Sequence, residues 1–123
     1  VIKDLLKLKV YDLCRLVNER ADDEVIPHNI IVKPPSAELR PDQRDDQSLP
    51  PYEVLDPILS LYVEHDRTAH DIIGEGHEPE MVSRITRLVD IAEYKRRQSP
   101  PGVRVTEKAF GKDRRVPITN GYR

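Results

Sequence analysis

Apolar residues at three- and four-residue steps predict a helix at the beginning of the chain. The stretch over 2–17 carries its apolar side chains at Ile2, Leu5, Leu6, Val10, Leu13 and Val17. This spacing places them on one face of an amphipathic α-helix. We expect the helix to end at Asn18 and at the acidic residues Asp22, Asp23 and Glu24 that follow.

A second helix is expected near the middle of the chain. Its apolar face is Val54, Leu55, Ile58, Leu59, Tyr62 and Val63. The apolar spacing is compatible with a start near Pro51 and with a start at Asp56. In the second case Asp56 would be the N-cap and Pro57 the first helical residue, where its missing N–H costs nothing.

Two further helices are expected before residue 98. Thr68 and Asp71 resemble a capping box with the shorter acid, and Gly74 and Gly76 should close the brief helix that it opens. Pro79 then begins the helix that we expect to be the longest and most regular. Its apolar face is Met81, Ile85, Leu88, Val89 and Ala92, and its last turn is Lys95, Arg96 and Arg97.

The remaining C-terminal residues contain little regular pattern. The sequence Ser-Pro-Pro-Gly over 99–102 should stop the long helix. Residues Val103 to Thr106 alternate like a short strand, and the tail to Arg123 is expected to be irregular. These elements predict a mainly α chain of about four helices, with a long loop over 25–51, a helical region over 52–98 and an irregular tail over 99–123.

The segment from Lys33 to Asp56 contains five prolines, six acidic residues and two arginines, which no simple helix or strand accommodates. A loop longer than about 12 to 15 residues in a compact domain is usually functional or disordered. Apolar residues at Ile30, Ile31, Val32, Leu39, Leu49 and Tyr52 favour an ordered, functional loop. The alternative is a stiff linker between two helical pieces.

Composition limits what the chain can bind. The formal net charge of -2 offers no general attraction for nucleic acid or anionic membranes. Cys14 lies among apolar residues at helical spacing and is expected to pack rather than react. The four histidines show no metal-binding spacing, and no apolar run approaches the roughly 20 residues that span a bilayer. With 37% hydrophobic and 5% aromatic residues and Val1 in first place, we expect a part of a longer protein.

Four segments resemble consecutive motifs of one family. They are KPPSAELRPDQ from Lys33, SLPPYEVLD from Ser48, EYKRRQ from Glu93 and AFGKDRRVPITN from Ala109. In this order they are similar to motifs of glutamine-dependent NAD synthetases, enzymes that amidate deamido-NAD with ATP, Mg²⁺ and ammonia derived from glutamine. The family pattern also implies a second helix that begins at the Pro-Pro-Tyr turn and runs through Pro57 as a local defect.

The same resemblance implies what the sequence lacks. Members of this family have an amide-hydrolysing (glutaminase) domain and then an α/β Rossmann-like synthetase domain of the ATP-pyrophosphatase type, which opens with an SGGxDS loop. The 123 residues contain no SGGxDS string. The chain therefore resembles the C-terminal portion of the synthetase domain, incomplete and inactive alone, from a cytoplasmic and homo-oligomeric enzyme. The family's magnesium carboxylates would lie upstream of it.

The resemblance implies an ATP side within the proline-rich loop. Lys33 corresponds to the lysine that approaches ATP phosphate, and Ser48 to a hydroxyl near the same nucleotide. An isolated lysine is usually a solvated surface charge, so the motif alone distinguishes Lys33. The nearby Glu38, Asp42, Asp45 and Asp46 are expected to pair with arginines or shape the turn rather than bind metal.

The resemblance also implies a deamido-NAD side. Lys95, with Tyr94 beside it, resembles the lysine that contacts this substrate, and Lys7 corresponds to a lysine on the substrate side, although Leu8 replaces the family's threonine. Arg96 and Arg97 are explained by the dipole of a helix C-terminus. No catalytic residue and no metal ligand is expected within the chain.

A helix-turn-helix DNA-binding module over 68–98 is the alternative from a different functional class. A short helix, a glycine turn and a longer helix with Ser83, Arg84, Arg87, Lys95, Arg96 and Arg97 resemble that layout. The net negative charge and the acids Glu75, Glu78, Glu80 and Glu93 count against it. A third possibility is a helical segment whose apolar faces need partners.

Overall fold

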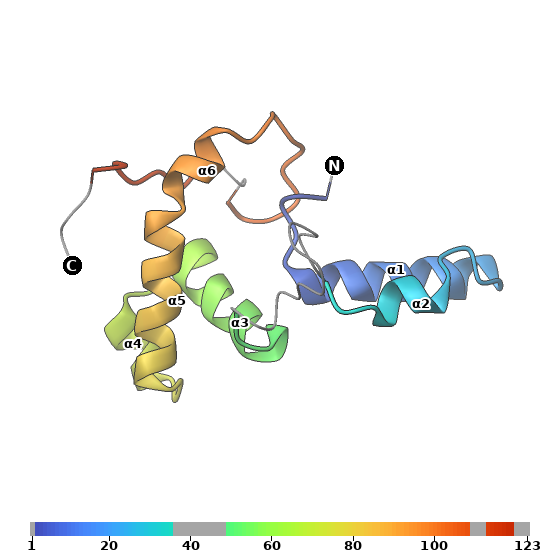
Figure 1. Cartoon of the computed structure of the whole chain (residues 1–123), viewed down its shortest axis with the longest axis horizontal. Coiled ribbons are helices and arrows are strands. Elements are labelled where there is room, and N and C mark those ends of the chain that lie inside the picture. The colour runs from blue at the N-terminus through green and yellow to red at the C-terminus, as the bar shows by residue number, and fades with distance from the viewer. Residues whose placement is uncertain (1, 36–48, 109–112, 120–123) are drawn as a thin grey trace, which may run out of the picture. The chain divides into compact units, whose positions relative to one another are not determined.

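The computed structural model describes residues 2–35, 49–108 and 113–119, and these are mainly helical (Figure 1). The elements are α1 (Lys7–Ala21), α2 (His28–Val32), α3 (Tyr52–Leu59), the π-helical η2 (Ser60–Glu64), α4 (Ala69–Gly74), α5 (Pro79–Ile91) and α6 (Glu93–Arg97). No strand is assigned within the described ranges. The mainly α prediction is confirmed, with six α-helices where about four were expected. The chain divides into one unit over Leu6–Asp56 and another over Val1–Leu5 with Pro57–Arg123.

Helix α1 begins and ends later than the apolar spacing predicts. It starts at Lys7 rather than Ile2, so the predicted start was wrong. It continues past Asn18 to Ala21, so the end is confirmed at the acidic residues but not at Asn18. The Asn18 side chain does not stop the helix because it bonds outside it. Its amide nitrogen donates to the Ile26 carbonyl and its amide oxygen accepts the Ile26 N–H, each at 2.8 Å. The helix ends where Asp22 adopts a left-handed conformation with φ 50°.

Asp56 caps α1, although it is distant in sequence. The α1 N-cap residue, Leu6, has no polar side chain, and the free N–H of Leu8 donates instead to Asp56 Oδ2 at 2.8 Å. A carboxylate at a helix N-terminus satisfies an unpaired donor and complements the helix dipole. Asp56 is therefore not the N-cap of its own helix, and that reading of Asp56 and Pro57 was wrong.

Helix α3 instead begins at Tyr52 and contains Pro57, as the family pattern implies. Proline has no N–H to donate within the helix. The chain continues directly into the π-helical η2, which starts at Ser60. Prolines and π-helical turns are both common sites of helix kinks, and both occur here.

We expect Asp56 to make the stability of the Leu6–Asp56 unit depend on pH. Burial raises the pKa of Asp56, helped by the charge of Glu53 and opposed by the Leu8 N–H. A raised folded-state pKa stabilises the fold below the unfolded value of about 3.9 and loses that contribution as pH rises through the folded value. As pH rises from about 4 to about 7, the urea unfolding midpoint of the natural chain should therefore fall relative to the midpoint of Asp56→Asn. If the difference between the two midpoints does not change with pH, burial does not raise the pKa of Asp56.

The second unit has a small apolar core between helices. Its fully buried side chains include Ile58 from α3, Ile72 from α4, and Val82 and Ile85 from α5. Helices α4 and α5 pack against each other. The Thr68 and Asp71 capping box is confirmed, because each side chain accepts the other's backbone N–H, and Gly76 in the turn has φ 98°.

The buried face of α5 differs from the predicted one. Val82, Ile85 and Thr86 are buried, whereas Leu88 is 36% exposed. Thr86 can occupy the buried face because its hydroxyl donates to the Val82 carbonyl at 3.0 Å. Apolar spacing missed this polar residue because its hydroxyl is satisfied within the helix.

The predicted longest helix is in fact two helices. Helix α5 ends at Ile91, Ala92 leaves helical geometry, and α6 is a separate five-residue helix. With 13 residues, α5 is shorter than the 15-residue α1. The stop before Ser99-Pro100 is confirmed, since α6 ends at Arg97.

Residues 103–106 do not form the predicted strand. The N–H groups of Val105 and Thr106 donate to Asp4 Oδ2 at 2.7 and 2.9 Å, and the Thr106 hydroxyl donates to the same oxygen at 2.9 Å. Lys3 Nζ donates to Ser99 Oγ at 2.9 Å. The backbone donors that a strand would need are thus used by a carboxylate, which joins the beginning of the chain to residues 99–106.

Candidate functional site

The predicted site residues fall in both units, and each group is described by itself. Lys7 and Lys33 belong to the unit over Leu6–Asp56, and Tyr94 and Lys95 belong to the other. Ser48 lies outside the residues that the structure describes.

Lys7 is the first residue of α1, where a cation is unfavourable for the helix dipole. The half-buried side chain is held by an aromatic residue instead, since its Nζ lies 5.2 Å from the centre of the Tyr11 ring one turn further along. Such a cation–π contact is worth about 0.5 to 1 kcal/mol at an exposed site. The contact is about as large as the unfavourable dipole term and therefore offsets it.

Lys33 follows α2 directly and is exposed at the beginning of the proline-rich loop. The next residues, Pro34 and Pro35, line a pocket of about 210 Å³ together with Leu49, Pro50, Pro51, Tyr52 and Glu53. Residues 34–35 therefore lie beside residues 49–53, whereas residues 28–32 of the predicted loop over 25–51 form α2 instead. Pockets for drug-sized ligands usually measure about 300 to 1,000 Å³, so this one has room for a ring-sized group at most.

Helix α6 has buried side chains and exposed side chains. Glu93 and Arg96 are buried, whereas Tyr94 is 47% exposed and Lys95 is exposed. A five-residue helix has no stability of its own. Its position therefore depends on the buried pair, which leaves Tyr94 and Lys95 available to other molecules.

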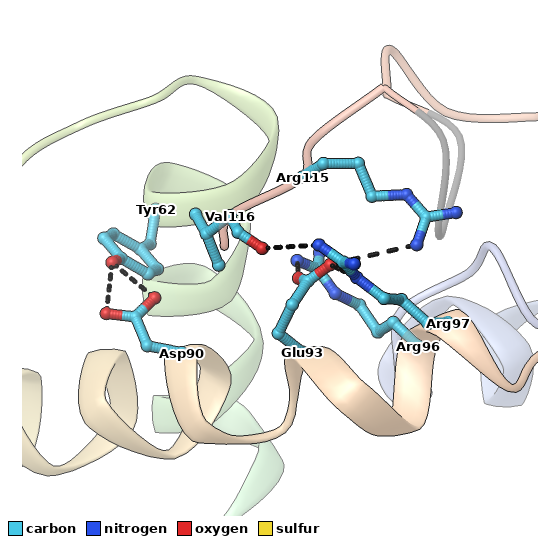
Figure 2. Close-up of polar contacts among 7 residues, drawn as sticks. All are labelled: Tyr62, Asp90, Glu93, Arg96, Arg97, Arg115 and Val116. Atoms are coloured by element: carbon cyan, nitrogen blue, oxygen red, sulfur yellow. Dashed lines mark hydrogen bonds and ion pairs between the residues drawn. The ribbon is translucent and has the colours of Figure 1, made fainter. Parts of the chain in front are cut away.

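The buried anchor of α6 is one carboxylate among three guanidinium groups (Figure 2). Glu93 is 1% exposed; its Oε2 pairs with Arg96, and its Oε1 lies 3.4 Å from Arg97 Nε and 3.8 Å from Arg115 Nη1. Burial by itself would raise the pKa of Glu93, but the hydrogen bonds and charges of Arg96 and Arg97 outweigh it and lower the pKa. We refer to these four residues as the Glu93 cluster.

A second polar group lies between η2 and α5 (Figure 2). The Tyr62 hydroxyl donates to Asp90 Oδ1 and Oδ2 at 2.9 and 3.1 Å. The Arg114 guanidinium carbon lies 4.2 Å from the centre of the Tyr62 ring. Burial raises the pKa of Tyr62, so the phenol stays protonated and keeps donating.

The sequence interpretation missed the Glu93 cluster. Arg96 and Arg97 were assigned to the helix dipole alone, which the structure corrects because both contact Glu93. Their positions three and four residues after Glu93 were the available signal. Arg115 and the Asp4 contacts gave no such signal, since both partners lie far away in sequence.

Two observations concern the described parts of the chain only. No three histidine, cysteine, aspartate or glutamate side chains gather there as a metal ion would require. None of the helices formed by those residues has the length and apolar character to cross a membrane.

Comparison with known proteins identifies relatives along the whole chain. The family model described as NAD synthase matches residues 1–99. The chain is 49% identical to glutamine-dependent NAD(+) synthetase of Acinetobacter baylyi over 100% of this chain and 23% of the relative. It is 48% identical to that of Thermotoga maritima over 100% of this chain and 21% of the relative. The chain thus spans less than a quarter of these relatives' length.

A solved structure agrees with these matches. Glutamine-dependent NAD+ synthetase from Acinetobacter baumannii in complex with adenosine diphosphate is similar with a TM-score of 0.57 and 41% identity, over 97% of this chain and 20% of that one. None of the matches described here supports the helix-turn-helix alternative.

Proposed function

Because the chain belongs to the NAD synthase family, we propose that it is the C-terminal part of the synthetase domain of a glutamine-dependent NAD synthetase. The whole enzyme would adenylate deamido-NAD with ATP, and ammonia from glutamine would then displace AMP to give NAD. The observation that carries this proposal is 49% identity to such a synthetase along all 123 residues. The α/β Rossmann-like fold of the parent domain is consistent with the family.

In this proposal the chain binds and orients substrates. Lys95 and Tyr94 would contact deamido-NAD from the exposed side of α6, and Lys7 would lie on the same substrate's side. Positioned cations offset the negative charge of phosphates and of a carboxylate being activated, which lowers the barrier only if they are held in place. The buried Glu93 and Arg96 pair supports that requirement for Lys95.

Lys33 and Ser48 would face ATP from the proline-rich loop. The exposure of Lys33 beside a pocket supports this assignment for the lysine, and the ADP complex of the Acinetobacter baumannii relative supports a nucleotide site in the family. The described residues offer no carboxylate cluster for magnesium. The ligands of this ion would come from other parts of the enzyme, and the glutaminase domain would also lie outside this chain. Homo-oligomerisation and a cytoplasmic location stay predictions.

We expect NAD formation to require the rest of the enzyme. The longer protein that contains this sequence should convert ATP, deamido-NAD and ammonia into NAD, AMP and pyrophosphate. The isolated 123 residues should show no turnover above a blank, because they contain no SGGxDS loop for pyrophosphate. The assay is coupled detection of NAD. Absence of NAD formation by the longer protein would overturn the proposed function, and turnover by the isolated chain would show that the loop is dispensable.

A further inference from the structure

The Glu93 cluster holds more positive charge than its carboxylate neutralises. Three guanidinium groups, from Arg96, Arg97 and Arg115, surround the single Glu93 side chain. Neither Asp90, which accepts the Tyr62 hydroxyl, nor Asp113, which pairs with Arg104 at 3.3 Å, has an ion pair recorded with these three arginines. Like charges held together in this way repel one another unless a further anion joins them.

Two of these arginines converge on the surface. Arg97 Nε and Arg115 Nη1 both approach the same atom, Glu93 Oε1, at 3.4 and 3.8 Å. Their side chains remain 43% and 42% exposed, so both guanidinium groups have N–H donors directed away from the carboxylate. A surface groove runs beside them, lined by Arg97, Arg115, Val116, Pro117, Ile118 and Thr119.

A hydrogen bond connects the two sides of the groove. Arg97 Nη2 donates to the Val116 carbonyl at 3.0 Å, which attaches the segment after Arg115 to α6 (Figure 2). Arg96 is 9% exposed and does not line the groove, so among the described residues only Arg97 and Arg115 offer it guanidinium donors.

We propose that this groove binds a small phosphate-type oxyanion between Arg97 and Arg115. Guanidinium forks match the oxygen spacing of phosphate and bind it through paired hydrogen bonds. Glu93 would orient both arginines without contacting the anion. The site uses neither Lys95 nor Tyr94 nor Lys33, so it is distinct from the substrate contacts proposed above and does not depend on them.

Titration of the full-length enzyme with inorganic phosphate tests this site. Calorimetry at constant ionic strength should give saturable binding that Arg115→Gln and Arg97→Gln each weaken about tenfold or more, since each removes a charged hydrogen bond. Arg115→Gln is the variant of choice because its half-exposed side chain lies furthest from the buried carboxylate. Arg87→Gln, an exposed arginine of α5, is the matched control and should bind as the natural protein does.

Three results would overturn the proposal. The first is equal phosphate affinity in the natural enzyme and in both cluster variants. The second is a loss confined to Lys33→Ala, which would place the bound phosphate at the ATP side. The third is binding of an acidic peptide, but not of phosphate, that depends on Arg115, which would make the groove a protein-docking surface.

Discussion

Replacement of Glu93 by alanine should destabilise its unit more than any other single change considered. The substitution leaves Arg96, which is 9% exposed, without its carboxylate partner. Removing one member of a buried ion pair typically costs about 3 to 5 kcal/mol because the remaining charge stays buried and unpaired. Thermal or urea unfolding of the full-length enzyme should show the loss, and amide exchange should locate it in α6.

Two further variants separate charge from packing at this position. Glu80→Ala removes an exposed acid from the first turn of α5 and should cost no more than about 1 kcal/mol, the size of a favourable helix-dipole contact. Glu93→Leu combined with Arg96→Met replaces the pair by apolar groups and should recover most of the stability, because no buried charge remains. If Glu93→Ala lowers the free energy of unfolding no more than Glu80→Ala does, other contacts stabilise Arg96 and Glu93 does not anchor α6.

The effect of Glu93 should also depend on pH. Its lowered pKa means that its contribution to stability is present above the unfolded value of about 4.3 and is lost as pH falls below it. The difference between the natural enzyme and Glu93→Gln should therefore shrink on the acid side. This direction is opposite to that expected for Asp56, because the pKa of Asp56 is raised by burial.

The parts of the fold that could be predicted are those decided by neighbouring residues. The capping box at Thr68 and the stop before Ser99 depend on side chains within one turn, so they were confirmed. The start of α3 at Tyr52 followed the family pattern, while local chemistry alone also permitted Asp56. The prediction of Asp56 as an N-cap of its own helix was wrong because its carboxylate accepts an N–H of a different helix, α1.

The remaining differences come from contacts between residues distant in sequence. Val105 and Thr106 fail to form a strand because Asp4, about a hundred positions earlier, takes their N–H groups. The same holds for Arg115 and Glu93. Periodicity contains no information on such pairs, so it predicts elements better than it predicts a site. The motif predicted that Lys95 contacts the substrate, but not the buried Glu93 and Arg96 pair on the same helix.

Lys95→Ala should separate catalysis from stability most clearly. Lys95 is exposed in the last turn of α6, so its removal should change unfolding free energy by no more than about 0.5 kcal/mol. If it contacts an anionic group of deamido-NAD, the lost charged hydrogen bond should cost about 1.5 to 3 kcal/mol. That corresponds to a fall of about 10- to 150-fold in kcat/KM for deamido-NAD.

The measurement is steady-state kinetics of the full-length enzyme with ammonia supplied, so that glutamine hydrolysis is bypassed, beside a melting curve. Lys9→Ala is the matched control, since Lys9 is an exposed lysine of α1, and it should leave both results unchanged. Lys95→Arg keeps the charge but not the compact ammonium, so partial activity is expected from it. An unchanged kcat/KM for Lys95→Ala would leave Lys95 as a solvated charge at a helix end, since the helix dipole alone already favours a cation there.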